Sequence, residues 1–197
     1  MIDEGYIKFE LEWRQGKLPD ADAVAELNEW RKPLYDAGLI GQYHDIGVGF
    51  GNISVRSNNG QFVISGTQTG HLDTLAAEHY TTVTAYDTAA NKVCCEGPVK
   101  ASSESMTHAT LYELSNEINA VVHVHSARLW RKFLGKLPTT DPTVSYGTPE
   151  MAEAFRRLYL DTVFATNGIA VMAGHDDGII AIGRNMREAA QRILGPS

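Results

Sequence analysis

Hydrophobic positions at the start of the chain recur at helical spacing, which predicts two helices in the first third. One pattern covers residues 7–14. The other follows Asp20 and Asp22, either of which can cap it, and places Leu27 and Leu34 on one apolar face. A capping oxygen followed by apolar residues at a period near 3.6 is typical of a helix N-terminus.

Strand patterns follow this helical region. Two β-type runs, at 52–56 and 61–65, flank the sequence Ser57-Asn58-Asn59-Gly60. Asn-Gly supplies the positive φ that a tight hairpin needs, so these residues predict a β-hairpin. A third strand is expected over 81–86 and a turn near Asn91.

The second half of the chain alternates helical and strand patterns. In chain order we expect a helix at 106–112 with Ser103 as its N-cap, a buried strand at 118–125, a helix at 149–159, a strand pair at 169–173 and 179–182, and a helix at 186–194. Such a mixture predicts an α/β protein with a mixed sheet. No repeat or long internal linker divides the sequence, so we expect one domain over residues 1–197.

Composition and charge narrow the classes of partner. The formal net charge of -7 opposes nucleic acid or an anionic membrane as the main partner, although local donors can still bind a small anion. The N-terminus lacks the pattern of a signal peptide, and no apolar run reaches the ~20 residues that span a bilayer. Cys94 and Cys95 are adjacent and have no metal-site spacing. We therefore expect a cytoplasmic protein.

His123-Val124-His125 is the first candidate for chemistry. Residues two apart on a strand project from the same face, so both imidazoles could converge on one metal ion. The alternative is that two histidines share a strand face without a ligand. The preceding residues 118–122 are apolar, and burying two unpartnered imidazoles among them would be costly. The pattern therefore favours a metal site.

Ser102-Ser103-Glu104 is the second candidate. Hydroxyl groups and free N–H groups at a helix start can bind an anion, although a simple helix cap explains the serines equally well. Glu104 offers a carboxylate as a ligand or general base. The third candidate combines Gly51-Asn52-Ile53-Ser54 with Ser65-Gly66-Thr67, where small residues allow a ligand to approach the backbone; ordinary turn chemistry is the alternative.

Taken in order, these motifs resemble the class II aldolase and adducin superfamily, which includes fuculose-phosphate aldolase and ribulose-phosphate 4-epimerase. The resemblance covers residues 51–193. The motifs that carry it are Gly51-Asn52-Ile53-Ser54, Ser65-Gly66, Ser102-Ser103-Glu104, Val121-Val122-His123-Val124-His125 and Tyr146-Gly147-Thr148. It implies a three-layer α/β/α sandwich with a mixed, largely antiparallel central sheet.

The resemblance also implies roles for individual residues. A substrate phosphate would be held by Asn52, Ser65, Gly66, Ser102 and Ser103. Glu104 would be the catalytic acid/base. The histidines would bind Zn2+, or Mn2+, Co2+ or Fe2+ in its place. Members of the superfamily are typically cytoplasmic homotetramers with sites at subunit interfaces.

The chain departs from the superfamily pattern in the third metal ligand and in two tyrosines. The third histidine of the superfamily directly precedes a glycine, whereas this chain has Gly174-His175-Asp176-Asp177-Gly178. Either His175 is the ligand or Asp177 replaces it, and we favour His175 because imidazole suits zinc. The stretch from His125 to Tyr146 is shorter than in fuculose-phosphate aldolase, and little sequence follows the last helix. We therefore expect neither of the tyrosines that those two segments supply there.

These features favour a lyase that cleaves a phosphorylated ketose through a metal-stabilised enediolate. An epimerase, dehydratase or decarboxylase could use the same metal site, although the epimerase branch has Asp at the position of Glu104. A non-catalytic adducin-like module would lack the metal ligands. Among other candidates, we expect His108 to pack or hydrogen-bond, and His71 and Lys100 to be solvated.

Overall fold

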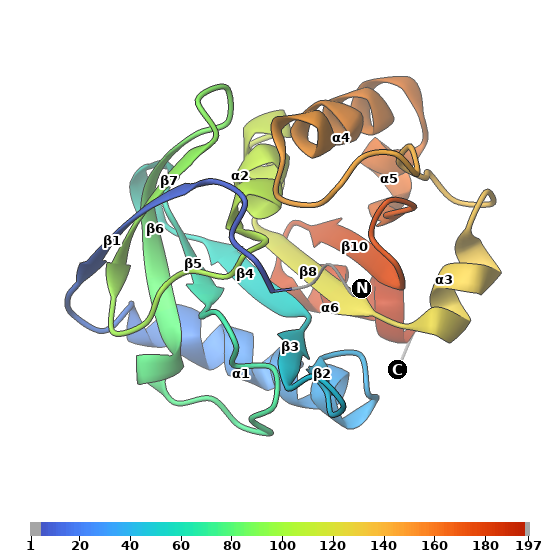
Figure 1. Cartoon of the computed structure of the whole chain (residues 1–197). Coiled ribbons are helices and arrows are strands. Elements are labelled where there is room, and N and C mark those ends of the chain that lie inside the picture. The colour runs from blue at the N-terminus through green and yellow to red at the C-terminus, as the bar shows by residue number, and fades with distance from the viewer. Residues whose placement is uncertain (1–4, 196–197) are drawn as a thin grey trace.

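A computed structural model of the chain describes residues 5–195, and its centre is an eight-stranded sheet (Figure 1). The strand order is β1-β7-β6-β5-β4-β8-β10-β9. The strands are β1 (Glu10–Gln15), β4 (Asn52–Arg56), β5 (Phe62–Ser65), β6 (Tyr80–Asp87), β7 (Lys92–Gly97), β8 (Ala120–His125), β9 (Ile169–Val171) and β10 (Gly178–Gly183). Among these strands only β1 and β7 pair in parallel, which confirms a mixed, largely antiparallel sheet. A separate hairpin joins β2 (Gly41–Tyr43) to β3 (Val48–Phe50).

Helices cover both faces of the sheet, which confirms the three-layer sandwich (Figure 1). One face carries α1 (Ala21–Asp36) and α6 (Met186–Leu194), and the other carries α2 (Ser105–Leu114) and α4 (Pro149–Asp161). Shorter elements are α3 (Ala127–Phe133), α5 (Phe164–Asn167) and the 3-10 turns η1 (Asn58–Gly60) and η2 (Ala77–His79). Within residues 5–195, none of the helices has the length and apolar character needed to cross a bilayer.

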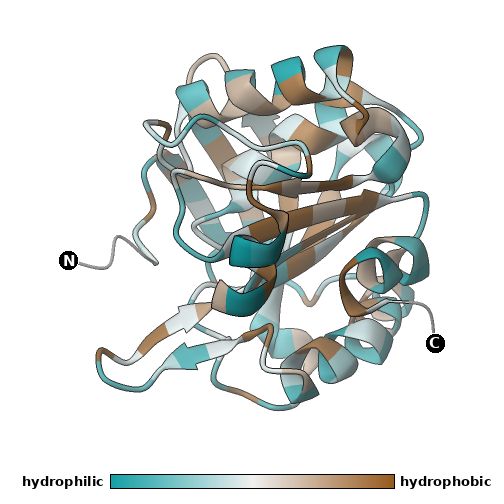
Figure 2. Ribbon diagram, turned by 90° about the vertical axis from the view of Figure 1, so that its right-hand side faces the viewer, coloured by the Kyte–Doolittle hydropathy of each residue, from teal (hydrophilic) through white to brown (hydrophobic). Residues whose placement is uncertain are grey.

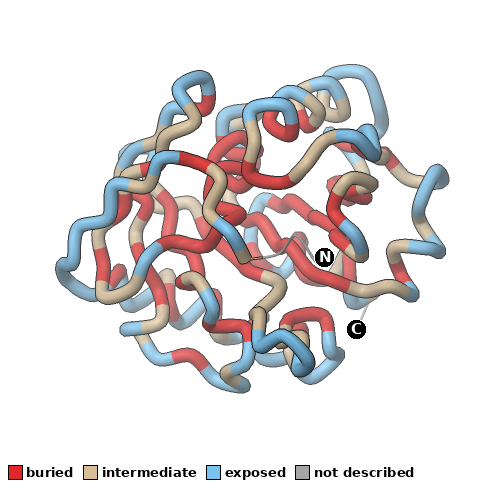
Figure 3. Tube along the Cα trace, in the orientation of Figure 1, coloured by how far each residue is buried: buried red, intermediate tan, exposed pale blue. Residues whose placement is uncertain are grey.

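Alternation along β8 divides its side chains between two cores. Val122 and Val124 pack with residues of α1 and α6, whereas Val121 packs with residues of α2 and α4. His123 and His125 have the same parity as Val121, so they face the α2 side. β8 and β10 are buried along their whole length (Figure 3). Figure 2 shows these central strands as the most hydrophobic part of the ribbon.

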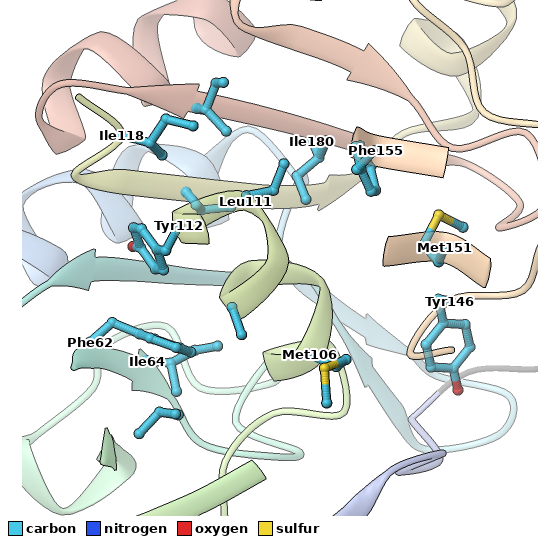
Figure 4. Close-up of a cluster of buried hydrophobic side chains, with 14 of the residues drawn as sticks. Phe62, Ile64, Met106, Leu111, Tyr112, Ile118, Tyr146, Met151, Phe155 and Ile180 are labelled. Carbon is cyan, nitrogen blue, oxygen red and sulfur yellow. The ribbon is translucent and has the colours of Figure 1, made fainter. Parts of the chain in front are cut away.

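The core on the α2 side is built from large side chains between the sheet and two helices (Figure 4). Leu111 and Tyr112 of α2 and Phe155 of α4 face Ile180 of β10 and Phe62 of β5 in this cluster. All five are at most 2 % exposed, so this interface is dry and closely packed.

The first long helix forms as its sequence predicts. Asp20 caps α1, because its carboxylate accepts hydrogen bonds from the backbone N–H groups of Asp22 and Ala23. Leu27 and Leu34 are fully buried on its inner face. The hairpin of β4 and β5, the strands β6, β8, β9 and β10, and the helices α2, α4 and α6 also lie where the sequence predicts them.

The helix expected over residues 7–14 is wrong, because this segment contains the edge strand β1. Its backbone pairs with β7, with Glu10 opposite Lys92 and Gln15 opposite Gly97. The Lys92 ammonium also lies 2.5 Å from a Glu12 carboxylate oxygen. Partners some eighty residues away in the chain supply these interactions, so no local pattern reveals them.

The N-cap expected at Ser103 is also wrong. α2 begins one residue later, and Glu104 occupies the N-cap position without a side-chain cap hydrogen bond. Ser102 organises the turn, because its Oγ accepts from the Glu104 N–H at 3.3 Å and its carbonyl accepts from the Ser105 hydroxyl at 2.7 Å. The Glu104 carboxylate is thereby left available for other contacts.

Replacing Leu27 by alanine tests the packing of α1 on the sheet. Leu27 has no solvent exposure, so Leu27→Ala should lower the free energy of unfolding by about 2–5 kcal/mol, measured by urea denaturation. Leu18→Ala is the matched control, because Leu18 is 54 % exposed and should change stability by less than about 0.5 kcal/mol. Equal effects of the two substitutions would contradict this packing.

Candidate functional site

Three histidines from two segments meet on the α2 side of the sheet. His123 and His125 share one face of β8, as the sequence predicts. His175 comes from the loop between β9 and β10. β10 runs antiparallel to β8 with Gly178 opposite His125, so this strand pair brings the loop beside the other two histidines.

The imidazole nitrogens of these histidines converge. The His125 Nε2 atom lies 3.0 Å from the Nε2 atoms of both His123 and His175. The three candidate ligand atoms all lie within 4.8 Å of one another. A tetrahedral ion with Zn–N bonds of about 2.0–2.1 Å needs ligand nitrogens about 3.3 Å apart, so small side-chain rotations suffice to accommodate it.

Hydrogen bonds and burial prepare the imidazoles as ligands. The His123 Nδ1 atom lies 3.2 Å from the Ile179 carbonyl, which accepts its proton and directs the Nε2 lone pair towards the other histidines. The His125 Nδ1 atom lies 3.1 Å from the Tyr43 hydroxyl. Burial lowers the pKa of His123 to about 4 and the pKa values of His125 and His175 well below their usual range. All three rings are therefore neutral near pH 7.

The buried carboxylate of Glu104 lies beside the three histidines. Its Oε1 atom lies 3.7 Å from the His175 Nε2 atom, and neither carboxylate oxygen has a hydrogen-bond partner of normal geometry. Burial raises the pKa of Glu104 to about 7, while the nearby Thr107 hydroxyl and Lys8 ammonium oppose that shift. A carboxyl group with a pKa near neutrality can both accept and return a proton.

The loop between β9 and β10 presents His175, and not Asp177, to the other histidines. Among the described residues, Asp177 is not part of the group whose ligand atoms converge. It adopts a positive φ of 64°, and its carbonyl accepts from the Ser126 N–H. Gly178 makes room for the His175 ring, because a Cβ at this glycine would lie 2.6 Å from the ring's Cδ2 atom.

A small polar pocket lies at the start of α2. Four of the residues expected to bind phosphate line it: Asn52, Gly66, Ser102 and Ser103. The other lining residues are Gly5, Gly49, Gly51, Thr67, Gln68, Thr69 and Gly70. The pocket has a volume of about 20 Å³, close to the space that one water molecule needs. This pocket is hereafter called the anion pocket.

Ser65 does not line the anion pocket. It is buried, and its Oγ accepts a hydrogen bond from the Ile53 N–H at 3.3 Å. Asn52 has a buried Oδ1 atom without a partner and lies opposite His123 in the pairing of β4 with β8. Ser103 and Glu104 are adjacent in the chain. The anion pocket and the histidine cluster therefore adjoin each other.

The remaining sequence candidates lie outside this centre. His108 is buried and its Nδ1 atom lies 2.7 Å from the Ser54 Oγ, which confirms a packing and hydrogen-bonding role. His71 is exposed. The Lys100 ammonium lies 5.7 Å from the centroid of the Trp13 ring, on the exposed side of β1.

The sequence patterns do not mark Lys8 or Tyr43 and give Tyr146 no role of its own. The Tyr146 ring lies 4.5 Å from the His175 ring between centroids, and the Lys8 ammonium lies 3.9 Å from the Tyr146 centroid. Tyr43 reaches His125 from the β2–β3 hairpin. The Tyr146-Gly147-Thr148 motif pointed to this region, but no local pattern marks Lys8 or Tyr43.

Solved structures share this fold at low sequence identity. An L-fuculose 1-phosphate aldolase superposes with a TM-score of 0.68 at 18 % identity, over 90 % of this chain and 82 % of that one. The L-fuculose-1-phosphate aldolase of Thermus thermophilus superposes with a TM-score of 0.61 at 22 % identity, over 89 % of this chain and 87 % of that one. A candidate aldolase/epimerase/decarboxylase of Klebsiella pneumoniae superposes with a TM-score of 0.65 at 19 % identity, over 88 % of this chain and 84 % of that one. At such identities the likeness establishes the fold alone.

Sequence comparison defines the family. A search of curated proteins finds no match. The family model of the Class II Aldolase and Adducin N-terminal domain matches residues 38–195, which include the histidine cluster, Glu104 and nearly all of the anion pocket. The chain therefore belongs to the class II aldolase and adducin family.

Proposed function

We propose that the protein is a metal-dependent aldolase that reversibly cleaves a phosphorylated ketose. The observation that carries this proposal is the convergence of three buried, neutral imidazoles beside the buried Glu104 carboxylate. Two structural neighbours are L-fuculose 1-phosphate aldolases, which supports the same reaction class.

The residues present fit a divalent metal ion. Three imidazole ligands with one open position are a common arrangement for catalytic zinc, and Mn2+, Co2+ or Fe2+ would also accept these donors. The closely spaced nitrogens and the unpartnered Glu104 oxygens are polar atoms that a cation would satisfy. When bound there, such an ion supplies Lewis-acid stabilisation of the negative charge that develops on the ketose oxygens.

The protein's own side chains transfer the proton and orient the substrate. Glu104 moves the proton at the nucleophilic carbon, for which its raised pKa suits it. Asn52, Ser102 and Ser103 orient the substrate by hydrogen bonds to its phosphate at the start of α2. Burial of the histidine cluster excludes bulk water, which strengthens each of these polar interactions.

Decarboxylation is the second candidate reaction. Loss of a carboxyl group as CO2 would leave a similar negative charge on the substrate oxygens, which the same ion would stabilise. The description of the Klebsiella pneumoniae neighbour includes this reaction. Glu104 in place of Asp counts against an epimerase, and the complete set of candidate ligands in this chain counts against a non-catalytic adducin-like module. We further propose that the protein is a single-domain, cytoplasmic homotetramer with sites at subunit interfaces, as is typical of the superfamily.

Elemental analysis tests the metal site. Gently purified protein should contain close to one divalent ion per chain, and His123→Ala combined with His125→Ala should remove it, because a single remaining imidazole cannot hold the ion. His71→Ala is the control, since His71 is exposed and is not part of the converging group. Full occupancy in the double variant would refute the site, and loss in Asp177→Ala but not in His175→Ala would move the third ligand to Asp177.

Proton exchange tests Glu104. Metal-replete protein should exchange the α-proton of dihydroxyacetone phosphate with deuterated water, and Glu104→Gln should slow this by about a hundredfold or more while keeping its metal. Glu113→Gln serves as the control, because Glu113 lies at the far end of α2 in a pair with Arg156. Equal exchange by Glu104→Gln would remove Glu104 from the chemistry. A wild type without exchange would favour decarboxylation or dehydration instead.

Phosphate binding tests the anion pocket. Inorganic phosphate should bind to the wild-type protein, and Ser103→Ala should weaken this by about tenfold, the cost of one hydrogen bond to a charged group. Ser57→Ala is the control, because Ser57 lies in the β4–β5 turn. A crystal soaked in phosphate should show the anion beside Asn52 and Ser102. Density elsewhere with this pocket empty would argue for a substrate without phosphate.

A further inference from the structure

A buried arginine holds the loop that follows β5. Arg31 of α1 is 2 % exposed and lies on the inner face of the helix, which Leu27 and Leu34 otherwise make apolar. Burying a guanidinium is costly unless its N–H groups are hydrogen-bonded. The Arg31 side chain donates to three backbone carbonyls of this loop, those of Thr69 and Asp73 at 3.1 Å and that of Leu72 at 2.6 Å. Arg31 therefore anchors the loop to α1.

Part of this loop is a wall of the anion pocket. Residues 66–70 all line the pocket, and the loop runs beside α1 after leaving β5 (Figure 1). Thr69 connects the pocket to Arg31, because it lines the pocket while its carbonyl accepts from the guanidinium. The Thr69 hydroxyl donates to the Gly66 carbonyl at 2.8 Å. The carbonyl oxygens of Gly66 and Thr69 are thus engaged by the protein itself.

The hydrogen bond from Arg31 sets the direction of the peptide unit between Thr69 and Gly70. In a trans peptide the C=O and N–H bonds point in opposite directions. With the Thr69 carbonyl turned towards Arg31, the Gly70 N–H points away from it. Gly70 is buried, and within residues 5–195 its N–H makes no hydrogen bond. Nearly all buried N–H groups are paired with protein, water or a ligand, so this donor is suited to a ligand.

The Gly70 nitrogen lies beside a second residue of the pocket. A Cβ at Gly49, which also lines the pocket, would lie 3.2 Å from this nitrogen. The same turn is held from the side of β3, because the Gln68 Oε1 atom accepts from the Gly49 N–H at 2.9 Å. Gln68 has a positive φ of 58°. The wall is therefore fixed between α1 on one side and β3 on the other.

Two other side chains of α1 hold the same loop outside the pocket. Asn28 donates to the Leu75 carbonyl at 2.9 Å, and the Tyr35 hydroxyl donates to the His71 carbonyl at 3.3 Å. Neither of these carbonyls belongs to a residue that lines the pocket. Of the three anchors, Arg31 is the one that reaches a pocket residue, which separates its role from general support of the loop.

We propose that Arg31 is a positioning residue for phosphate recognition: by holding the Thr69 carbonyl, it directs the Gly70 N–H at an anionic oxygen in the anion pocket. This inference rests on the phosphate-binding role proposed above for the pocket, but not on the aldolase reaction or on the metal site. It adds a backbone donor to the candidate donors of Asn52, Ser102 and Ser103.

The phosphate affinity of Arg31 variants tests the positioning role. Inorganic phosphate should bind Arg31→Met about tenfold or more weakly than wild type in titration calorimetry, because a peptide unit that is free to rotate loses one hydrogen bond to a charged group. Arg31→Lys should regain part of the affinity, since an ammonium can still hold the Thr69 carbonyl. The metal content of both variants should equal that of wild type.

Asn28→Ala is the matched control, because it releases the same loop at Leu75. It should lower stability to urea and leave phosphate affinity unchanged. A loss of affinity in Asn28→Ala as large as that in Arg31→Met would reduce Arg31 to general support of the loop. Equal affinity of Arg31→Met and wild type would also overturn the inference.

A phosphate-soaked crystal of the wild-type protein tests the donor without a substitution, and it decides the question if Arg31→Met does not fold. A phosphate oxygen should lie within about 3.2 Å of the Gly70 nitrogen. Phosphate bound at Ser102 and Ser103, with no oxygen at that distance from Gly70, would overturn this inference and leave the anion pocket in place. Wild-type protein that binds no phosphate would overturn both.

Discussion

The burial of four ionisable side chains in an apolar interior is the constraint on which the site depends. His123, His125, His175 and Glu104 are each at most 4 % exposed, among strands that are otherwise hydrophobic. Burying such groups without partners costs several kcal/mol each. Contacts such as those of His123 with the Ile179 carbonyl and of His125 with Tyr43 offset part of this cost. The three candidate ligand nitrogens converge beside the Glu104 carboxylate, at a place where a cation would be stabilised.

The pairing register of β8 determines which face of the sheet its two histidines occupy. β8 is flanked by β4 and β10, and these pairings set Asn52 opposite His123 and Gly178 opposite His125. A slip of one residue would turn both histidines to the side of α1 and α6 and turn Val122 and Val124 towards the site. The valines that fill the opposite core therefore fix the orientation of the ligands, although neither touches the site.

Features with local causes could be predicted from the sequence, and features with distant causes could not. The shared face of His123 and His125 follows from the two-residue period of a strand, and the start of α1 follows from the Asp20 cap. The strand at Glu10–Gln15 depends on pairing with β7, so the local hydrophobic pattern over residues 7–14 predicted a helix incorrectly. Ligand chemistry favoured His175 over Asp177 from the sequence, and His175 does join the converging group. The loop conformation and the space beside Gly178 that place it there are not revealed by residue spacing.

The candidate site residues lie in the part of the chain that matches the family model. Residues 38–195 supply the histidines, Glu104 and the serines, whose positions are fixed by the strands and by the start of α2. With the proposed metal ion bound, such a site would favour any ligand that can chelate the ion, because chelating atoms are common to many substrates. Selectivity must then come from groups that contact the rest of the ligand. Gly5 lines the anion pocket and Tyr6 contacts Tyr146, so a change in this N-terminal segment would alter the surface beside the buried cluster and leave the histidines in place.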